Sequence, residues 1–554
     1  MCRLRFVSQW DLPKVNRGNS MKGVVVCPQP RAAEVGAEVL EKGGNAFDAA
    51  LATAFSQMVN DPFMCGLGGM GTLHYFHAAT GTSGMIDFYN RAGSKVRPNM
   101  WEKDCKGRTP ISGYSLFDDF RSEIGYTAIM TPGTPAGLGL FHEKLGSMPW
   151  TDLIVPAIEQ ADEGILITPN LATVWSGYAQ LGIPDGLTRI RKTAECARVY
   201  LHPKGRLFKV GDVMHLPDYA RTLERLAKGG WREFHRGALG DEIARDLEAN
   251  GAFVTRQDLA DYQPEESAPL VGSYRGYEVR SNPPPGSGAT LIEMLQILEH
   301  FDLSALDHGS AQHIDLVARA MAAAHVDRNA YLGDPRFADV PTEMLISKKR
   351  AAYWAERIQS GRYAGGQEEA PPGCTTHVCV MDSEGNAVSM THTLGTAAGV
   401  VSPGLGFNYN NSMKLFDPVP NKKNSMAPGK ARTTGMVPTM LLKDGKPVLL
   451  AGAPGGSVII SATLQAILNV VDFGMSPVEA VTVPRIHCEG LGIHTEATVP
   501  RSVIKELRAL GHTVHQSAHS FEPSMSRAHV ISTIGGRMRG GADPRGGAGV
   551  VYAR

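Results

Sequence analysis

Residues 375–394 read TTHVCVMDSEGNAVSMTHTL, and this stretch predicts a β-hairpin. Val378 and Val380 alternate with neighbours of different character, which is the period of a strand that has two unlike faces. Residues 382–386 have the composition of a turn, and residues 387–394 form a second run rich in Val and Thr. The hairpin alone favours a purely structural role for its first residue, because branched threonine suits strands.

The run TTHVCVMDSEGNAV, followed by THTLG, resembles the signature of the γ-glutamyltranspeptidase family. The resemblance implies an N-terminal-nucleophile hydrolase, made as one chain that cuts itself before the first Thr of the TTH run. In this sequence the autocleavage bond would join Cys374 to Thr375. Thr375 would then be the catalytic nucleophile.

The chemistry explains why such a cut is useful. A Thr hydroxyl is a weak nucleophile that needs a nearby base. Cleavage would give Thr375 a free α-amine with a pKa near 8. That amine can take the hydroxyl proton during attack and return a proton to the leaving amine. No metal or cofactor is then required, and we expect none.

Further segments resemble the family in the same order along the chain, from about Gly23 to Pro544. They include KGGNAFDAA at 42–50, GLGGMG at 66–71, PGTPAG at 132–137 and YLGDP at 331–335. The resemblance implies an α+β fold, the four-layer αββα sandwich, in which two stacked sheets carry helices on both outer faces.

A predicted strand, the residues Pro454-Gly455-Gly456-Ser457 and a predicted helix follow one another in the second half. Backbone N–H groups at a helix N-terminus lack internal partners and favour negative charge. The resemblance implies that Gly455 and Gly456 form the oxyanion hole. Without it, a plain strand-to-helix turn would be the preferred interpretation. Thr393 matches the family threonine that supports the nucleophile's hydroxyl.

The substrate-binding positions depart from the family pattern. Family members carry an Arg that binds the substrate α-carboxylate, and Tyr89 takes its place here. Arg91 lies two residues further on and would share a strand face with Tyr89. Two interpretations stay open for Arg91: a substitute for the missing Arg, or a surface residue.

The positions that bind the substrate's α-amine in the family also differ in this sequence. The family Asn that helps to hold this end is Gly395 here. Asn411 is followed by Ser412-Met413-Lys414-Leu415 instead of the family's Gln-Met-Asp-Asp, so the acidic partner of the ammonium is Leu415. Burying an ammonium without such a partner costs several kcal/mol.

The family's Ser-Ser pair, which binds the α-carboxylate, is Thr433-Thr434, and this change keeps two hydroxyl donors. We therefore expect a substrate whose acyl group ends in a carboxylate but lacks the α-amine. The segment between Met413 and Thr433 is shorter than in members that have a lid loop, so we expect a more open site.

The expected organisation has three parts: an N-terminal tail at 1–22, a large subunit at 23–374 and a small subunit at 375–554. The two subunits would form one intertwined domain and a heterodimer, with a dimer of heterodimers left open. The Gly- and Pro-rich segment 361–373 would be the loop that leaves the site after cleavage.

Acidic and basic residues balance at 55 each, which gives no electrostatic argument for a nucleic-acid or membrane partner. We expect the short basic run 189–192 to be a solvated helix face. The N-terminal residues show no secretory signal, so we expect a cytoplasmic location with free thiols.

The leading hypothesis is a self-processing amidohydrolase that cleaves a small-molecule amide through a Thr375 acyl-enzyme. A true γ-glutamyltransferase or glutathione hydrolase is the first alternative. The second is an uncut, non-catalytic relative that serves as a binding scaffold. A serine hydrolase is disfavoured, because the sequence has no GxSxG elbow.

Overall fold

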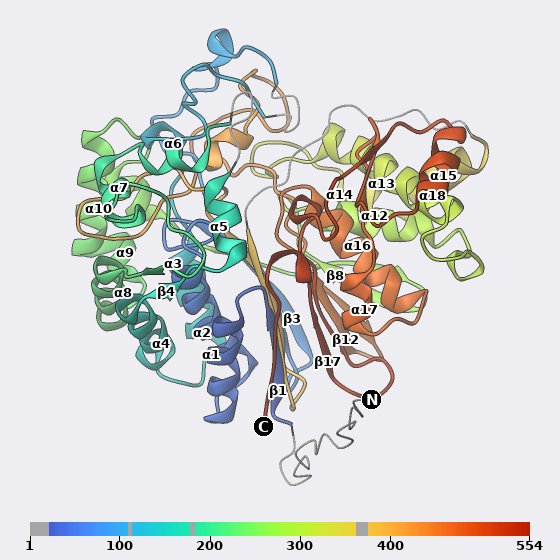
Figure 1. Ribbon diagram of the computed structural model, residues 1–554, viewed down its shortest axis with the longest axis horizontal. Helices are drawn as coiled ribbons and strands as arrows, with labels where there is room; N and C mark the ends of the chain where they lie inside the picture. Colours follow the sequence, from blue (N-terminus) through green and yellow to red (C-terminus); the bar gives the residue numbers. More distant parts are fainter. Residues whose placement is uncertain (1–20, 109–113, 178–182, 362–374) are drawn as a thin grey trace, which may run out of the picture.

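Two β-sheets lie face to face at the centre of the molecule, and helices cover the outer face of each (Figure 1). The computed structural model describes residues 21–108, 114–177, 183–361 and 375–554. The predicted α+β fold, a four-layer αββα sandwich, is confirmed.

The first sheet has seven strands in the order β18-β1-β9-β10-β2-β3-β6, and all neighbours are antiparallel. Its central hairpin is β9–β10, the hairpin expected from the sequence. The strands are β1 (Gly23–Cys27), β2 (Met70–His77), β3 (Thr82–Phe88), β6 (Glu265–Ser267), β9 (Thr376–Asp382), β10 (Ala387–Thr393) and β18 (Gly549–Ala553).

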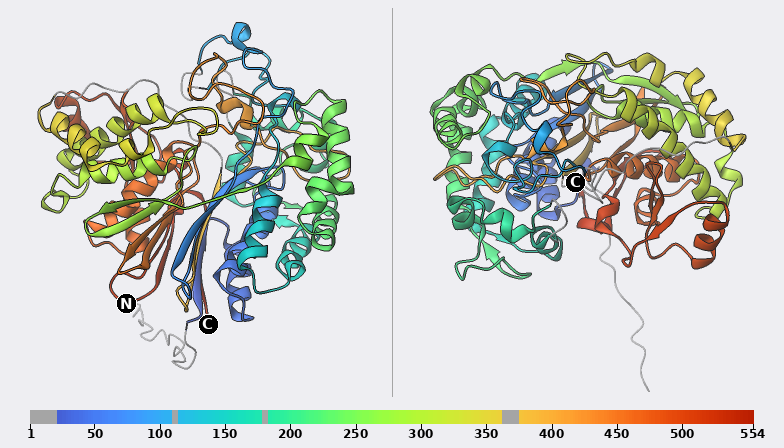
Figure 2. Two further views of the ribbon diagram at one scale, coloured as in Figure 1. Left: turned by 180° about the vertical axis from the view of Figure 1, so that it is seen from behind. Right: turned by 90° about the horizontal axis from the view of Figure 1, so that it is seen from above.

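The second sheet has six strands in the order β17-β16-β12-β11-β8-β7. They are β7 (Leu270–Tyr274), β8 (Tyr277–Ser281), β11 (Thr439–Lys443), β12 (Lys446–Gly452), β16 (His529–Ser532) and β17 (Arg539–Ala542). Segments from before and after the undescribed residues 362–374 contribute strands to both sheets (Figure 2). Two small sheets contain β4 (Ile165–Leu166) with β5 (Val213–Met214), and β13 (Ile486–His487) with β14 (Ile493–Thr495) and β15 (Val514–Gln516).

The α-helices from the part of the chain before β6 lie on the side of the first sheet (Figure 1). They are α1 (Pro30–Glu41), α2 (Ala46–Asn60), α3 (Thr134–Leu145), α4 (Trp150–Glu163), α5 (Pro169–Ser176), α6 (Gly186–Ile190), α7 (Ala194–Tyr200), α8 (Pro217–Gly229), α9 (Arg232–Arg236), α10 (Ala238–Ala249) and α11 (Arg256–Asp261). The helices on the side of the second sheet are α12 (Gly288–Leu298), α13 (Ala311–Tyr331), α14 (Thr342–Leu345), α15 (Lys348–Gln359), α16 (Val458–Val471), α17 (Pro477–Thr482) and α18 (Arg501–Ala509).

The alternation within β9 divides its side chains between two separate hydrophobic cores. Val378 and Val380 pack in the core between the first sheet and its helices. Cys379 and Met381 pack in the core between the two sheets. A third core lies between the second sheet and α12, α13 and α16. Each interface between two layers therefore has its own hydrophobic core. The alternation of side chains along a strand determines which core each side chain enters.

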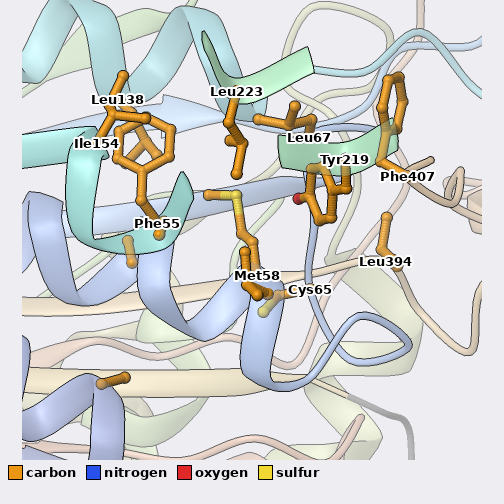
Figure 3. Close-up of a cluster of buried hydrophobic side chains, with 14 of the residues drawn as sticks. Phe55, Met58, Cys65, Leu67, Leu138, Ile154, Tyr219, Leu223, Leu394 and Phe407 are labelled. Carbon is orange, nitrogen blue, oxygen red and sulfur yellow. The ribbon is translucent and has the colours of Figure 1, made fainter. Parts of the chain in front are cut away.

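Figure 3 shows part of the first of these cores, in which side chains from α2 and α8 meet residues from the loops that follow β10. Phe55 and Met58 of α2 lie there with Tyr219 and Leu223 of α8. Leu394, the residue after β10, is also buried in this core. Its packing anchors the end of the hairpin on which the candidate site lies.

Two local features follow directly from adjacent residues. Asn45 caps α2, and a reciprocal capping box joins it to Asp48. The β11–β12 hairpin turns through Asp444 and Gly445, which have φ of 51° and 75°, as a two-residue turn of this twist requires.

Candidate active site

Thr375 lies directly before β9, at the end of the hairpin where β10 finishes. The register pairs Thr376 with His392, so Thr375 and Thr393 come next and lie opposite each other. The Thr375 hydroxyl donates to the Thr393 hydroxyl at 3.2 Å, and the Gly395 amide donates to the same Thr393 oxygen at 2.8 Å. The hairpin register thus joins the two threonines; their catalytic roles stay predictions.

Two buried glutamines hold the beginning of β9 in place. Gln57 of α2 donates from Nε2 to the Thr376 hydroxyl at 2.9 Å and to Gln29 Oε1 at 2.8 Å. Gln57 Oε1 also lies 2.9 Å from His392 Nε2. Gln29 in turn donates to Asp61 at 2.9 Å, and burial raises the pKa of Asp61 to about 6. Sequence reasoning missed these supports, because single amides in a helix and a loop carry no motif.

The turn Pro454–Ser457 joins β12 to α16, which begins at Val458. Gly455 and Gly456 have φ of 138° and 70°, a region that favours glycine. Among the residues that the structure describes, neither glycine amide donates a hydrogen bond. Both N–H groups are therefore available to an external acceptor, as an oxyanion hole requires. That role remains a prediction for both glycines.

Contacts between the sheets bring this turn toward the end of β9 that carries Thr375. The Ser389 hydroxyl donates to the Ala451 carbonyl at 3.4 Å. One residue along β12, a Cβ on Gly452 would lie 2.1 Å from His377 Cε1, so the strands approach closely there. β12 therefore advances toward the end of β9 that carries Thr375, and the glycine turn follows immediately.

Gly395 is surrounded by protein rather than by open space. Its φ is 78°, and a Cβ there would lie 2.3 Å from Asn411 Oδ1. The Asn411 amide donates to Glu123 Oε2 at 3.1 Å and to the Thr396 hydroxyl at 2.6 Å. Asn411 is thus engaged with neighbouring residues, and the position leaves no room for the family's asparagine side chain.

A compact charged cluster lies beside Thr396. Arg189 Nη2 lies 3.2 Å from Glu123 Oε2, and both side chains are buried. Lys414 Nζ lies 3.5 Å from the same oxygen, donates to the Thr396 hydroxyl at 2.8 Å and lies 4.7 Å from the Tyr114 ring centroid. The expectation that run 189–192 is a solvated helix face is wrong for Arg189, because its partners lie far away in the sequence. Sequence reasoning also missed Glu123 and Lys414.

Tyr89 is buried beside the segment that contains Ser412. Its hydroxyl accepts a hydrogen bond from Asn282 Nδ2 at 3.0 Å. The next residue, Asn90, accepts one from the Ser412 hydroxyl at 2.8 Å. Burial raises the pKa of Tyr89 well above its ordinary value, so its phenol is neutral. The structure thus places Ser412 against Asn90, the residue that follows Tyr89.

Arg91 is directed elsewhere. The argument that Arg91 shares a strand face with Tyr89 is wrong, because β3 ends at Phe88. Arg91 Nη2 lies 2.8 Å from Glu265 Oε1 in β6, and its guanidinium lies 5.9 Å from the Tyr262 ring centroid. Glu265 is therefore the acidic partner of Arg91, and the same carboxylate oxygen lies 3.7 Å from Arg336 Nη1.

Thr433 and Thr434 lie beside the glycine turn. A Cβ on the next residue, Gly435, would lie 2.0 Å from the Gly456 carbonyl oxygen, so the two backbones touch. Thr433 is partly exposed, whereas Thr434 is buried and its hydroxyl accepts the Met436 amide at 3.3 Å. The two threonines are therefore placed next to the predicted oxyanion hole, and their substrate-binding roles stay predictions.

Within the described ranges, no group of three or more His, Cys, Asp and Glu side chains is arranged to hold a metal ion. In the same part of the chain, no helix combines the length and apolar character needed to cross a membrane. Cys374, the predicted residue on the amino side of the cleavage bond, lies outside the described residues.

Comparisons with known proteins agree with this geometry. The family model "Gamma-glutamyltranspeptidase" matches residues 32–553. A glutathione hydrolase proenzyme of Escherichia coli strain K12 is 34% identical over 547 residues, which cover 95% of this chain and 90% of that protein. An Acylase ACY 1 proenzyme of Pseudomonas sp. strain V22 is 36% identical over 505 residues, which cover 90% of this chain and 88% of that protein.

A solved structure shares the whole architecture. The crystal structure of cephalosporin acylase from Bacillus halodurans has a TM-score of 0.85 to this chain and is 28% identical to it, with 99% of both chains covered. The fold, the family match and the relatives lead to one conclusion. The chain belongs to the γ-glutamyltranspeptidase family of enzymes and has the N-terminal-nucleophile hydrolase fold.

Proposed function

We propose that this enzyme is a self-processing amidohydrolase that cleaves an amide through an acyl-enzyme on Thr375. The observation that carries the proposal is the Thr375 hydroxyl, held by the Thr393 hydroxyl at 3.2 Å at the free end of the hairpin. The unengaged amides of Gly455 and Gly456 at the neighbouring turn support it. The similarity to proteins named proenzymes supports cleavage of the Cys374–Thr375 bond in this chain.

The reaction would follow from the groups present. The α-amine of Thr375 takes the hydroxyl proton while the oxygen attacks the amide carbon. The two glycine amides donate to the resulting oxyanion, and removal of one such donor typically costs about 3–4 kcal/mol of transition-state stabilisation. The intermediate then collapses, the protonated α-amine gives its proton to the leaving amine, and water hydrolyses the ester on Thr375.

We further propose an acyl group that carries a carboxylate but lacks an α-ammonium group. Near Gly395, Glu123 is the carboxylate that could bind an ammonium, and Arg189 and Lys414 already surround it. Leu415 and Gly395 add no charge or hydrogen-bonding side chain. An ammonium would therefore lose water without gaining a partner.

Two measurements test the proposal. Sequencing of the purified protein should find a new N-terminus that reads Thr-Thr-His-Val, and Thr375→Ala should remain uncut and inactive. Wild type should hydrolyse glutaryl-p-nitroanilide faster than γ-glutamyl-p-nitroanilide, which differs from it by the α-amine. Turnover of the γ-glutamyl compound alone would favour the glutathione hydrolase alternative. An active, uncut chain would contradict the proposed nucleophile.

A further inference from the structure

Arg432 is a buried cation without an acidic partner. Arg432 as a whole is only 4% exposed. Nη1 donates to the Thr433 carbonyl at 3.0 Å, but Nε makes no hydrogen bond. Within the described residues, no carboxylate forms an ion pair with this guanidinium. An uncompensated buried charge is destabilising, so such a group calls for a partner that binds from outside.

The neighbouring arginine and lysine side chains differ in this respect. Arg91 is paired with Glu265, and Lys414 and Arg189 share Glu123. Arg432 differs from these three cations, because no described carboxylate pairs with its guanidinium. Arg328, a second buried arginine close to Arg432, donates to the Ser287 hydroxyl at 3.0 Å and is attracted by the carboxylate of Glu489.

The surroundings of Arg432 belong to the candidate site. It directly precedes Thr433 and Thr434, and the backbone that follows them touches the glycine turn at Gly456. The phenols of Tyr114 and Tyr89 lie close to the guanidinium, and so does the like-charged side chain of Arg328, which adds to the need for an anion here. Burial lowers the pKa of Arg432 to about 10, and the side chain keeps its charge at neutral pH.

We propose that Arg432 binds the carboxylate at the far end of the acyl group, and so makes the enzyme selective for amides of dicarboxylic acids. This inference rests on the proposed function and adds to it the residue that selects the substrate. Tyr89 occupies the position of the family's carboxylate-binding arginine, and Arg432 supplies a guanidinium from a different segment, beside the same hydroxyls. The planar guanidinium can donate two parallel hydrogen bonds to a carboxylate, while Thr433 offers a hydroxyl next to it.

The test compares two substrates that differ in the carboxylate. Glutaryl-p-nitroanilide carries it, and valeryl-p-nitroanilide has a methyl group in its place. Arg432→Met should lower kcat/KM for the glutaryl compound about 30- to 3,000-fold, the range expected when one partner of a buried charged pair is removed. It should change kcat/KM for the valeryl compound less than about threefold, since the nucleophile and oxyanion hole are intact.

Two further variants guard against misinterpretation. Arg432→Lys keeps the charge but loses the planar fork, so it should retain part of the glutaryl preference. Arg319→Met removes a half-buried arginine of α13 that is paired with Asp315 at 2.7 Å, and should leave both substrates unchanged. If Arg432→Met and Arg432→Lys fold, by thermal unfolding and circular dichroism, and keep the wild-type glutaryl preference, the assignment of Arg432 is wrong.

A binding measurement separates this inference from the proposed reaction. Calorimetry with free glutarate should show binding to wild type that is weakened at least about 30-fold by Arg432→Met. Glutarate binding that depends on Arg432, without hydrolysis of either anilide, would sustain the carboxylate site and overturn the proposed reaction. If Arg432→Met hydrolyses both anilides with the wild-type preference, or binds glutarate as tightly as wild type, the proposed carboxylate site is wrong. The proposed reaction on Thr375 is unaffected by that result.

Discussion

The β9–β10 hairpin, which carries the predicted nucleophile, and the predicted substrate-binding region of this enzyme are built in different ways. Thr375 and Thr393 meet through the register of one hairpin and are only 18 positions apart in the sequence. The substrate-binding region instead combines segments from distant parts of the chain: Asn411 meets Glu123 across 288 residues. The hairpin depends on one short segment, so substitutions elsewhere in the chain leave its register unchanged. The substrate-binding region depends on several segments, so a substitution in any one of them can change which charged groups lie there.

The largest loss of stability is expected at Glu123, because two buried cations of the substrate-binding region share its carboxylate. Glu123→Ala leaves Arg189 and Lys414 buried without their carboxylate, and should lower the free energy of unfolding by about 3–5 kcal/mol. Chemical denaturation measures this. The control is Glu163→Ala, which removes an exposed ion pair with Arg31 and should change stability by less than about 1 kcal/mol. Similar losses in both variants would contradict the distinction between the two kinds of ion pair.

The catalytic region should be sensitive in rate rather than in stability. Gly455→Ala forces a side chain onto a φ of 138° and places its Cβ 3.1 Å from Ser526 Cβ, so the glycine turn must shift. A misplaced oxyanion donor should lower kcat by about 10²-fold. Gly535→Ala is the matched control: it has a φ of 84° in an exposed turn with nothing near its Cβ, and should keep full activity. Unchanged kcat in Gly455→Ala would argue against the oxyanion hole.

A smaller effect is expected when the family residue is restored at one substrate-binding position. Gly395→Asn meets Asn411 Oδ1 and a φ of 78°, so it should destabilise the protein by about 1–3 kcal/mol. It should not create a preference for γ-glutamyl-p-nitroanilide, because Glu123 stays neutralised by its cations. A gain in γ-glutamyl turnover would show that this region needs only one residue to change its substrate.

The smallest expected change is in pH dependence. The folded-state pKa of Arg432 is lowered to about 10, so the guanidinium loses its proton only as pH rises through that value. The ratio of glutaryl to valeryl kcat/KM should therefore stay constant within about twofold from pH 6 to 9, even where the absolute rates follow the Thr375 α-amine. A ratio that falls steadily across this range would point to a different carboxylate-binding group.

Much of the local structure was predictable because its signals lie close together in the chain. The alternation in β9, the Asn45 capping box and the Asp444–Gly445 turn each follow from a few adjacent residues. The argument that Arg91 shares a strand face with Tyr89 failed for a related reason: the strand period was extended past Phe88, where β3 ends. Nothing in the neighbouring sequence marked that end.

The sequence by itself determined the hairpin that begins at Thr375 and the strand–turn–helix segment around Gly455 and Gly456, since periodicity and turn chemistry act over a few residues. Only the tertiary structure decided which charges are neutralised. Arg189 was expected on a solvated helix face and Arg91 was left open between two roles, yet both are paired with carboxylates in the fold, while Arg432 is buried without an acidic partner. The physical reason is that the energy of a buried charge depends on which distant groups the packing brings beside it.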